Sequence, residues 1–255
     1  MISVERHRLI LGMGRIGDIA NATWLSHWRQ ARKRVIPWIM FPRNRLPIVI
    51  FGCGGHGRVV ADALKVARAT LAGFLDDRPP ASLVNSIPVI GGRSCLEQPE
   101  FLRNYAILIA IGEVRLRRQL ALLVLERGGR LAKAIHPSAI IASDVSIGQG
   151  TVVMAGVVIN TGSRIGRFAI VNTGATVDHD NVVEDGVHIC PGCHLAGNVI
   201  CRADAFIGTG TSIIPRIQIG ARAVIGAGTA VISDVPPDVM ATGCPAVIKR
   251  RLDAN

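Results

Sequence analysis

The most regular hydrophobic pattern in this chain lies between residues 135 and 231. An aliphatic residue or a cysteine recurs there at every sixth position without an insertion: Ile135, Ile141, Ile147, Val153, Ile159, Ile165, Val171, Val177, Val183, Ile189, Leu195, Cys201, Ile207, Ile213, Ile219, Ile225 and Val231. An α-helix turns every 3.6 residues and cannot keep a period of six on one face. The pattern predicts a parallel β-helix, in which each hexad forms one flat side of a triangular coil.

The residues between these positions support such a coil. Four residues after each aliphatic position stands a small or β-branched side chain that suits a corner, from Ala139 to Val235. Glycine also recurs every 18 residues, which predicts a column at one corner where φ is positive: Gly156, Gly174, Gly192, Gly210 and Gly228. Asn181 breaks the corner rule, and such breaks tend to mark functional sites.

Residues 47–133 follow a different pattern, of short continuous apolar runs separated by helical segments. The runs cover residues 48–51, 71–75, 87–90 and 105–111. Continuous apolarity is typical of parallel strands covered on both faces, and the helical spacing of apolar residues between the first two runs completes a βαβ unit. This segment predicts a Rossmann-like α/β domain with one βαβ unit and two more strands.

Residues 1–46 show no clean period and carry nine Lys/Arg against two acidic residues, so they supply +7 of the +11 net charge. The remaining chain is only mildly basic and lacks the aromatic residues on which single-strand binders stack bases, so we expect no nucleic-acid partner. Targeting, membrane-surface contact and a mis-assigned start codon, with Met40 as the true start, all remain open for this segment.

Four regions follow from these patterns: a basic extension (1–46), the α/β domain (47–133), the β-helix (134–235) and a C-terminal tail (236–255). No apolar run approaches the roughly 20 residues that a membrane-spanning helix needs, so no span is expected. Six scattered cysteines without a secretory signal favour a cytoplasmic protein.

The turn after the first predicted strand carries candidate binding chemistry. Residues 52–57 read Gly-Cys-Gly-Gly-His-Gly, and Asp76 follows Gly57 by 19 residues. Glycines allow backbone N–H groups to approach a phosphate at the start of a helix. The segment is too short for both halves of a dinucleotide fold, which favours a nucleotide or nucleotide-sugar over NAD. A tight turn without a ligand is the alternative.

His179 is the candidate catalytic residue, because it lies beside the broken corner in Val177-Asp178-His179-Asp180-Asn181. Acyl transfer from a thioester needs a proton acceptor for the attacking group. A neutral imidazole, with a pKa of about 6.5, suits that task. Asp180 would orient the ring and stabilise the imidazolium.

The hexads resemble those of the hexapeptide-repeat acyltransferases. The glycine-rich turn, Phe74-Leu75-Asp76-Asp77, and Ala110-Ile111-Gly112 followed by Arg117 make the chain from residue 48 similar to the NeuD/PglD-type sugar acetyltransferases. This resemblance implies a left-handed β-helix, a homotrimer with active sites between subunits, and acetyl-CoA and a nucleotide-sugar as substrates. It also implies His179 as the base, although some members carry Glu at the position of Asp180.

The resemblance further implies a set of binding residues. For the nucleotide-sugar these are Gly54, Gly55 and His56 near the pyrophosphate or sugar, Asp76 and Asp77 at the nucleoside, and Gly112 beside them. For acetyl-CoA they are His188, Gly197 and the backbone near Thr209 and Ala227. A solvent-facing role is the alternative for His188. No metal is expected.

Other activities compete for parts of the sequence. The Cys190-Pro-Gly-Cys193-His194 stretch fits a zinc or haem motif, but Cys193 falls at an inward corner and no second CxxC exists. A γ-class carbonic anhydrase would share the β-helix and use histidines such as His179, His188 and His194, yet the glycine-rich domain has no place in it. A purely structural β-solenoid is a further alternative.

The sequence therefore predicts an acetyl-CoA-dependent acetyltransferase that acts on the amino group of a UDP-, GDP- or dTDP-linked deoxy-amino-sugar in glycan or polysaccharide assembly. O-acetylation of a sugar such as sialic acid is the close alternative. An NAD-dependent oxidoreductase and a non-catalytic nucleotide-sugar binder are distant ones.

Overall fold

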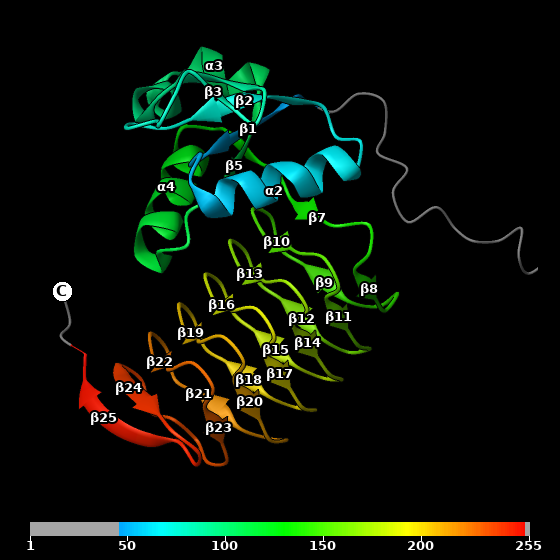
Figure 1. Ribbon diagram of the computed structural model, residues 1–255, viewed down its shortest axis with the longest axis vertical. Coiled ribbons are helices and arrows are strands. Elements are labelled where there is room, and N and C mark those ends of the chain that lie inside the picture. Colours follow the sequence, from blue (N-terminus) through cyan, green and yellow to red (C-terminus); the bar gives the residue numbers. More distant parts are fainter. Residues whose placement is uncertain (1–45, 253–255) are drawn as a thin grey trace, which may run out of the picture. The chain divides into compact units, whose positions relative to one another are not determined.

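The computed structural model describes residues 46–252 (Figure 1). Residues 1–45 and 253–255 lie outside this described part. The expectations for the basic extension, except for Leu46, and for the last three residues of the tail concern those residues. No helix within residues 46–252 combines the length and apolarity needed to cross a membrane.

The first domain is a six-stranded sheet with the order β3-β4-β2-β1-β5-β6. Its strands are β1 (Ile48–Phe51), β2 (Leu71–Leu75), β3 (Leu83–Val84), β4 (Ile87–Gly91), β5 (Ala106–Ile109) and β6 (Arg130–Leu131). Its helices are α2 (Gly55–Val66), α3 (Pro99–Asn104), α4 (Val114–Glu126) and the short 3₁₀ helix η1 (Arg93–Glu97). The β3–β4 pair is antiparallel, and the other pairs of this sheet are parallel.

The strand count in this domain corrects the prediction. The sequence indicated one βαβ unit plus two strands, which correspond to β1, β2, β4 and β5, whereas the sheet also contains β3 and β6. Each of these has only two residues, which is too short to form a distinct apolar run. Helix α4 connects β5 to β6 and covers the sheet with Leu120, Ala121 and Val124.

The second domain is a three-sided coil of two-residue strands (Figure 1). The first side holds β7 (Ala134–Ile135), β10 (Val152–Val153), β13 (Ile170–Val171), β16 (His188–Ile189), β19 (Phe206–Ile207) and β22 (Val224–Ile225). The second side holds β8 (Ile140–Ile141), β11 (Val158–Ile159), β14 (Thr176–Val177), β17 (His194–Leu195), β20 (Ser212–Ile213) and β23 (Ala230–Val231). The third side holds β9 (Ser146–Ile147), β12 (Arg164–Ile165), β15 (Val182–Val183), β18 (Ile200–Cys201) and β21 (Gln218–Ile219).

The tail contributes two further strands to the first side. β24 (Val239–Thr242) pairs in parallel with β22, and β25 (Val247–Arg251) pairs antiparallel with β24. The antiparallel strand forms the edge of that sheet, so the parallel winding stops here.

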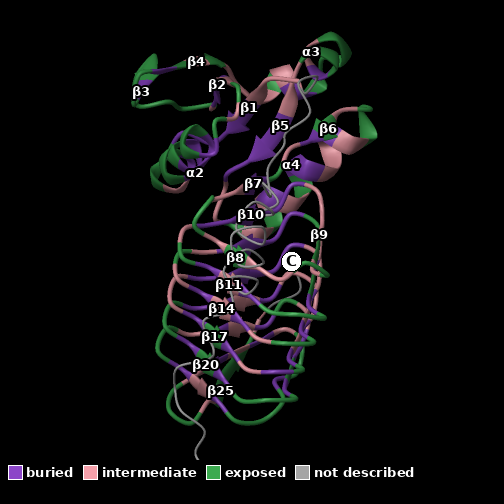
Figure 2. Ribbon diagram, turned by 90° about the vertical axis from the view of Figure 1, so that its right-hand side faces the viewer, coloured by how far each residue is buried: buried purple, intermediate pink, exposed green. Residues whose placement is uncertain are grey.

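The hexad prediction is confirmed residue by residue. The second residue of each strand points inward, and these side chains are buried from Val153 onward, while buried and exposed stretches alternate along each coil (Figure 2). The glycine column has the predicted positive φ, between 65° and 70° at all five positions. The fold class, an α/β domain joined to a left-handed parallel β-helix, is therefore confirmed.

The two domains share a hydrophobic core. The outward residues Ala134, Val152 and Ile170 on the first side of the coil are buried in the same cluster as Val60 and Leu64 of α2. Farther along this side, the outward positions become His188 and Phe206, which are buried and half-buried. The α/β domain therefore covers the start of the first side and leaves the second side open.

Candidate active site

His179 lies at the corner between the second and third sides, in the turn that joins β14 to β15. Its Nδ1 is 2.9 Å from Oδ2 of Asp180, whose backbone is left-handed with φ of 57°. Because the carboxylate accepts this hydrogen bond, Nδ1 donates and Nε2 keeps its lone pair. The His179 side chain is 49% exposed, so solvent reaches the ring.

The hydrogen bond that His179 donates to Asp180 raises the pKa of His179 above its ordinary value, and the negative charge of Asp178 acts in the same direction. The Asp178 carboxylate accepts from the backbone N–H of His179 at 2.8 Å and from the side chain of Asn160 at 2.8 Å. These two bonds lower the pKa of Asp178. The imidazole is thus a comparatively strong base held by its neighbours in the chain.

Two glycines make room for this pair. A Cβ atom on Gly197, one coil after His179, would overlap Nε2 of the imidazole, and a Cβ on Gly162, one coil before Asp180, would overlap Oδ1 of that aspartate. Gly197 was expected at acetyl-CoA, and the structure places it directly against the catalytic candidate. Any larger residue at either position would move the His179–Asp180 pair.

The glycine-rich turn lies at the carboxyl ends of β1, β2 and β5, the edge where α/β sheets bind ligands. Gly52 has φ of 101°, and a Cβ on Gly57 would overlap the carbonyl of Gly52, so both are required by the turn itself. Gly54, Gly55 and Gly112 are different, because a Cβ on any of them would meet no atom within 4 Å. The fold leaves open space beside Gly54 and Gly55 at the start of α2 and beside Gly112 after β5.

Asp76 and Asp77 follow β2 at the same edge. Oδ2 of Asp76 accepts from the backbone N–H of Cys53 at 2.9 Å, and its Oδ1 accepts from that of Arg78 at 2.9 Å. The Asp77 carboxylate accepts from the backbone N–H of Arg93 at 2.6 Å. Partial burial opposes ionisation of Asp76, but the hydrogen bonds prevail and lower its pKa.

His56 and His188 meet where the two domains join, with ring centroids 6.4 Å apart. Burial, aided by the charge of Arg117, lowers the pKa of each imidazole to about 4, so both are neutral at pH 7. Nδ1 of His188 lies 3.3 Å from the carbonyl of Gly112 and must donate to it, which leaves Nε2 of His188 as an acceptor facing Asn172 at 3.5 Å.

Arg117 of α4 fixes this junction. Its side chain is only 1% exposed and donates to the carbonyls of Ile111, Gly112, Phe168 and Gly186 at 2.6–3.0 Å. Burial lowers its pKa to about 10, so the group stays charged. The sequence presented Arg117 only as part of a motif, and no sequence pattern indicated that four carbonyls from both domains converge on it.

The predicted residues fall into two groups. His179, Asp180 and Gly197 share one corner of the coil. His188 lies on the first side, at the α/β domain, while Thr209 and Ala227 occupy turns at the corner between the first and second sides. In a three-sided coil the corner that holds His179 is opposite the first side, so one chain does not bring the two groups together.

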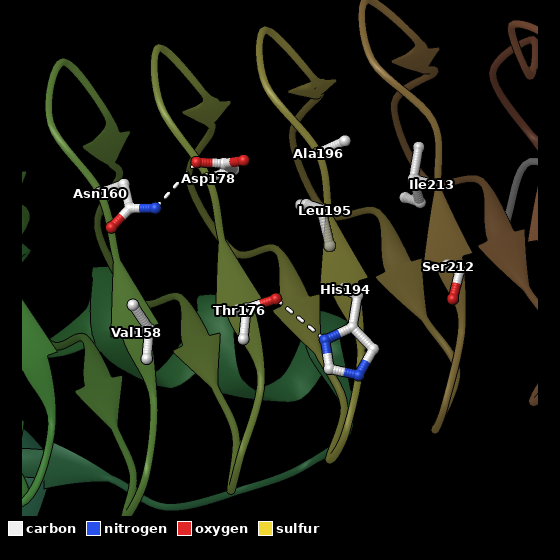
Figure 3. Close-up of a pocket in the computed structure, with 9 residues that line it drawn as sticks. All are labelled: Val158, Asn160, Thr176, Asp178, His194, Leu195, Ala196, Ser212 and Ile213. Atoms are coloured by element: carbon white, nitrogen blue, oxygen red, sulfur yellow. Dashed lines mark hydrogen bonds between the residues drawn. The ribbon is translucent and has the colours of Figure 1, made fainter. Parts of the chain in front are cut away.

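A shallow groove on the second side lies between these two corners (Figure 3). Figure 3 shows one row of residues formed by Val158, Thr176, His194 and Ser212 and a parallel row formed by Asn160, Asp178 and Ala196. His194 lies 2.9 Å from the Thr176 hydroxyl through its Nδ1. Asp178 belongs both to this groove and to the turn that carries His179.

The cysteines and histidines of the metal and haem alternatives lie in different surroundings. Cys193 is fully buried inside the coil, and burial raises the pKa of its thiol. His179, His188 and His194 stand on different parts of the coil. Among residues 46–252 no group of three or more His, Cys, Asp or Glu side chains is arranged to hold a metal ion.

Comparison with known proteins agrees with this geometry. The model of the PglD N-terminal domain family matches residues 47–122. The chain is 31% identical over 188 residues to GDP-perosamine N-acetyltransferase of Escherichia coli O157:H7, covering 70% of this chain and 82% of that protein. It is 42% identical over 145 residues to 2,3,4,5-tetrahydropyridine-2,6-dicarboxylate N-acetyltransferase of Brevibacillus brevis, covering 54% of this chain and 61% of that protein.

Among solved structures, PerB from Caulobacter crescentus in complex with CoA and GDP-perosamine has a TM-score of 0.76 and 41% identity, covering 80% of this chain and 97% of that one. The triangular coil and its corner imidazole define the class of hexapeptide-repeat acyltransferases. Within that class, the chain belongs to the PglD-type family of sugar acetyltransferases.

Proposed function

We propose that this protein transfers the acetyl group of acetyl-CoA to the amino group of a nucleotide-linked deoxy-amino-sugar, for glycan or polysaccharide assembly. The observation that carries the proposal is the state of His179, with Nδ1 held by Asp180 and Nε2 free at an exposed corner. The similarity to proteins named as GDP-perosamine N-acetyltransferase and solved with CoA and GDP-perosamine supports the substrate classes.

The chemical step needs one proton acceptor. The sugar amine attacks the thioester carbonyl, the C–S bond breaks, CoA leaves as the thiolate, and Nε2 of His179 takes the proton that the amine loses. The proton then passes to the thiolate, so that the products are the acetamido sugar and CoA–SH. Asp180 stabilises the imidazolium formed in between, as its effect on the His179 pKa indicates.

The α/β domain would hold the nucleotide-sugar. The open space beside Gly54, Gly55 and Gly112 admits a pyrophosphate at the start of α2, where backbone N–H groups face a negative charge. His56 would face the pyrophosphate or the sugar, and Asp76 and Asp77 the nucleoside. His188, Thr209 and Ala227 would contact acetyl-CoA.

A homotrimer would complete the site, because one chain keeps the two groups of residues apart. In residues 134–235 the exposed large hydrophobic residues are Ile140, Ile214 and Ile232. By their spacing of 18 residues, Ile140 extends the row that contains Val158, and the other two extend the row that contains Ala196. Packing the second sides around a threefold axis buries them. It also brings the His179 corner of one subunit to the corner of the next subunit that carries Thr209 and Ala227.

The acceptor and the cell compartment are part of the same proposal. The acceptor would be a UDP-, GDP- or dTDP-linked amino sugar, and O-acetylation of a sugar such as sialic acid is the alternative with the same base. We place the reaction in the cytoplasm, where acetyl-CoA is made, and no metal takes part in the step described.

The test is release of CoA thiol from acetyl-CoA in the presence of UDP-, GDP- and dTDP-linked 4-amino sugars. We expect turnover with at least one of them, and we expect His179→Ala to lower kcat by about 10²- to 10⁴-fold with little change in acetyl-CoA binding. His136→Ala, at an imidazole that contacts Ser138 in the first coil, serves as the control. Full turnover by the His179 variant would remove His179 from its proposed role.

A further inference from the structure

Asn181 is the residue that broke the corner pattern, and the acetyl-transfer step does not use it. Its side chain is 0% exposed inside the coil, two residues after His179. A buried carboxamide is costly unless its polar atoms are all bonded. Nδ2 donates to the carbonyls of Asp178 at 2.7 Å and Ala196 at 3.0 Å, and Oδ1 accepts from the N–H of Val199 at 3.0 Å.

Ser163 occupies the same corner one coil earlier and is 1% exposed. Its hydroxyl donates to the carbonyl of Asp178 at 2.7 Å and accepts from the N–H of Asn181 at 3.1 Å. The Asp178 carbonyl thus receives two side-chain donors, one from Ser163 and one from Asn181. It belongs to the peptide group directly before His179.

These contacts change how the two turns are closed. In ordinary corners of this coil the last N–H donates to the carbonyl three residues back, as from Val145 to Ala142 at the same corner of the first coil. In the turn 178–181 the Ser163 hydroxyl bridges the carbonyl of the first residue and the N–H of the last. In the turn 196–199 the side-chain amide of Asn181 makes the same bridge. Each turn is held open by a side chain from the coil before it.

The two opened turns are the ones that form the catalytic corner. The first carries His179 and Asp180, and the second carries Gly197, against which the imidazole rests. The carbonyl of His179 is fixed in addition by the N–H of Asn198 at 3.0 Å. The backbone on both sides of the imidazole is therefore tied to the coil interior through Ser163 and Asn181.

We infer that Ser163 and Asn181 are positioning residues, which set the place of His179 by bridging its turn and the next one with side-chain hydrogen bonds. This inference rests on the proposed function, because it assigns a task to residues that do not touch either substrate. It predicts that the loss of these bridges lowers kcat and leaves substrate binding intact.

The main variant is Asn181→Val, which places at this corner the residue found at positions 145 and 199. We expect kcat to fall by about 10- to 100-fold, the effect of displacing a catalytic group by about 1 Å. The KM values for acetyl-CoA and for the acceptor should stay within about two-fold, because the binding surfaces are unchanged. Asn181→Thr keeps a bridge to the next turn but loses the bond to Asp178. Its kcat should lie between the kcat of the wild-type protein and that of Asn181→Val.

Thr151→Val is the matched control. The Thr151 hydroxyl forms the same kind of bridge, donating to the carbonyl of Gly166 at 2.7 Å and accepting from the N–H of Ala169 at 3.1 Å, at the corner between the third and first sides. We expect Thr151→Val to lower Tm to an extent comparable with Asn181→Val while kcat stays unchanged. If Asn181→Val acted only by lowering stability, Thr151→Val would lower kcat to the same extent.

A double variant separates positioning from general damage. In the His179→Ala background Asn181→Val should lower the residual rate no further, since the group that it positions is absent. A further loss equal to that seen in the wild type would overturn the inference. So would full kcat in both Asn181 variants while His179→Ala is inactive, an outcome that leaves the proposed function standing. Full activity of His179→Ala would overturn the proposed function instead.

Discussion

The two halves of the candidate site are built in opposite ways. The edge of the α/β domain offers space and backbone, since Gly54, Gly55 and Gly112 have no side chains and meet no atoms where a Cβ would stand. The corner of the β-helix is crowded, and a Cβ on Gly162 or Gly197 would strike the His179–Asp180 pair. The first arrangement suits a ligand that arrives from outside, and the second suits a side chain that must not move.

This difference indicates which kinetic parameter each half controls. Under the proposed function, space at the α/β edge would set the affinity for the acceptor, because the nucleotide-sugar would have to fit there. Placement of His179 at the corner would set the rate of the chemical step, because the proposed base has to reach the attacking amine. The comparison holds only if the two halves act in the same site, which the proposed homotrimer would form between two subunits.

Mixed oligomers give the largest expected effect. Two variants, His179→Ala and Gly112→Leu, should each be nearly inactive at low acceptor concentration. When the two chains are co-expressed and assemble at random, some sites combine an intact corner with an intact α/β edge. A trimer that contains both variants has one such site among its three, so we expect doubly tagged trimers to restore about one third of the wild-type activity.

The measurement is CoA release by oligomers purified through two different tags. Separately purified variants that are mixed without subunit exchange provide the control. No recovery in the doubly tagged oligomers would mean that each site lies within a single chain, which contradicts the shared-site proposal.

The next largest effect comes from one substitution in each region, compared by steady-state kinetics. Gly112→Leu should raise the KM for the nucleotide-sugar by about 10- to 100-fold, because the added side chain fills ligand space at a cost of about 1–3 kcal/mol. The fold should tolerate the change, since nothing lies within 4 Å of a Cβ at Gly112. Steady-state kinetics and a thermal melt check both statements.

Gly197→Ala is the matched variant at the corner. Its Cβ would displace the His179 ring, so kcat should fall while the KM values change little. A rise in acceptor KM for the corner variant, or a loss of kcat alone for the edge variant, would contradict the division of labour between the two regions.

Asp180→Asn should give the smallest of these effects and a change in pH dependence. The Asp180 carboxylate raises the pKa of His179, so its loss returns that pKa toward the ordinary value. A general base works only when it is neutral, and activity therefore disappears as the pH falls through the pKa of His179. The acid limb of the kcat profile should move to lower pH, with a plateau about 10-fold lower.

Asp144→Asn provides the control for this profile. Asp144 lies two coils before Asp180 in the same corner column, and its carboxylate bonds to Thr161 and Gly162 instead of an imidazole. It should leave the acid limb in place. An acid limb that moves to higher pH in Asp180→Asn would contradict the role given to the carboxylate.

The β-helix and the α/β domain were predictable because each side of the coil and each main strand repeats a local rule. Residues 135–231 keep their period without an insertion, so every inward position follows from the first. The strands β3 and β6 escaped prediction, since two residues are too few to form a distinct run. His179 and Asp180 could be proposed from their spacing and chemistry, and Asn181 was noticed as a break in the pattern.

The sequence by itself determined the winding of the coil, the glycine column and the order of the domains, because these depend on residues a fixed number of positions apart. The tertiary structure decided what the spacing could not express: the carbonyls that converge on Arg117, the side-chain bridges of Ser163 and Asn181, and the separation of His179 from His188 on opposite parts of the coil. These features depend on which atoms meet across the coils and the domain junction. Such contacts follow from packing in three dimensions, and no repeat in the sequence reveals them.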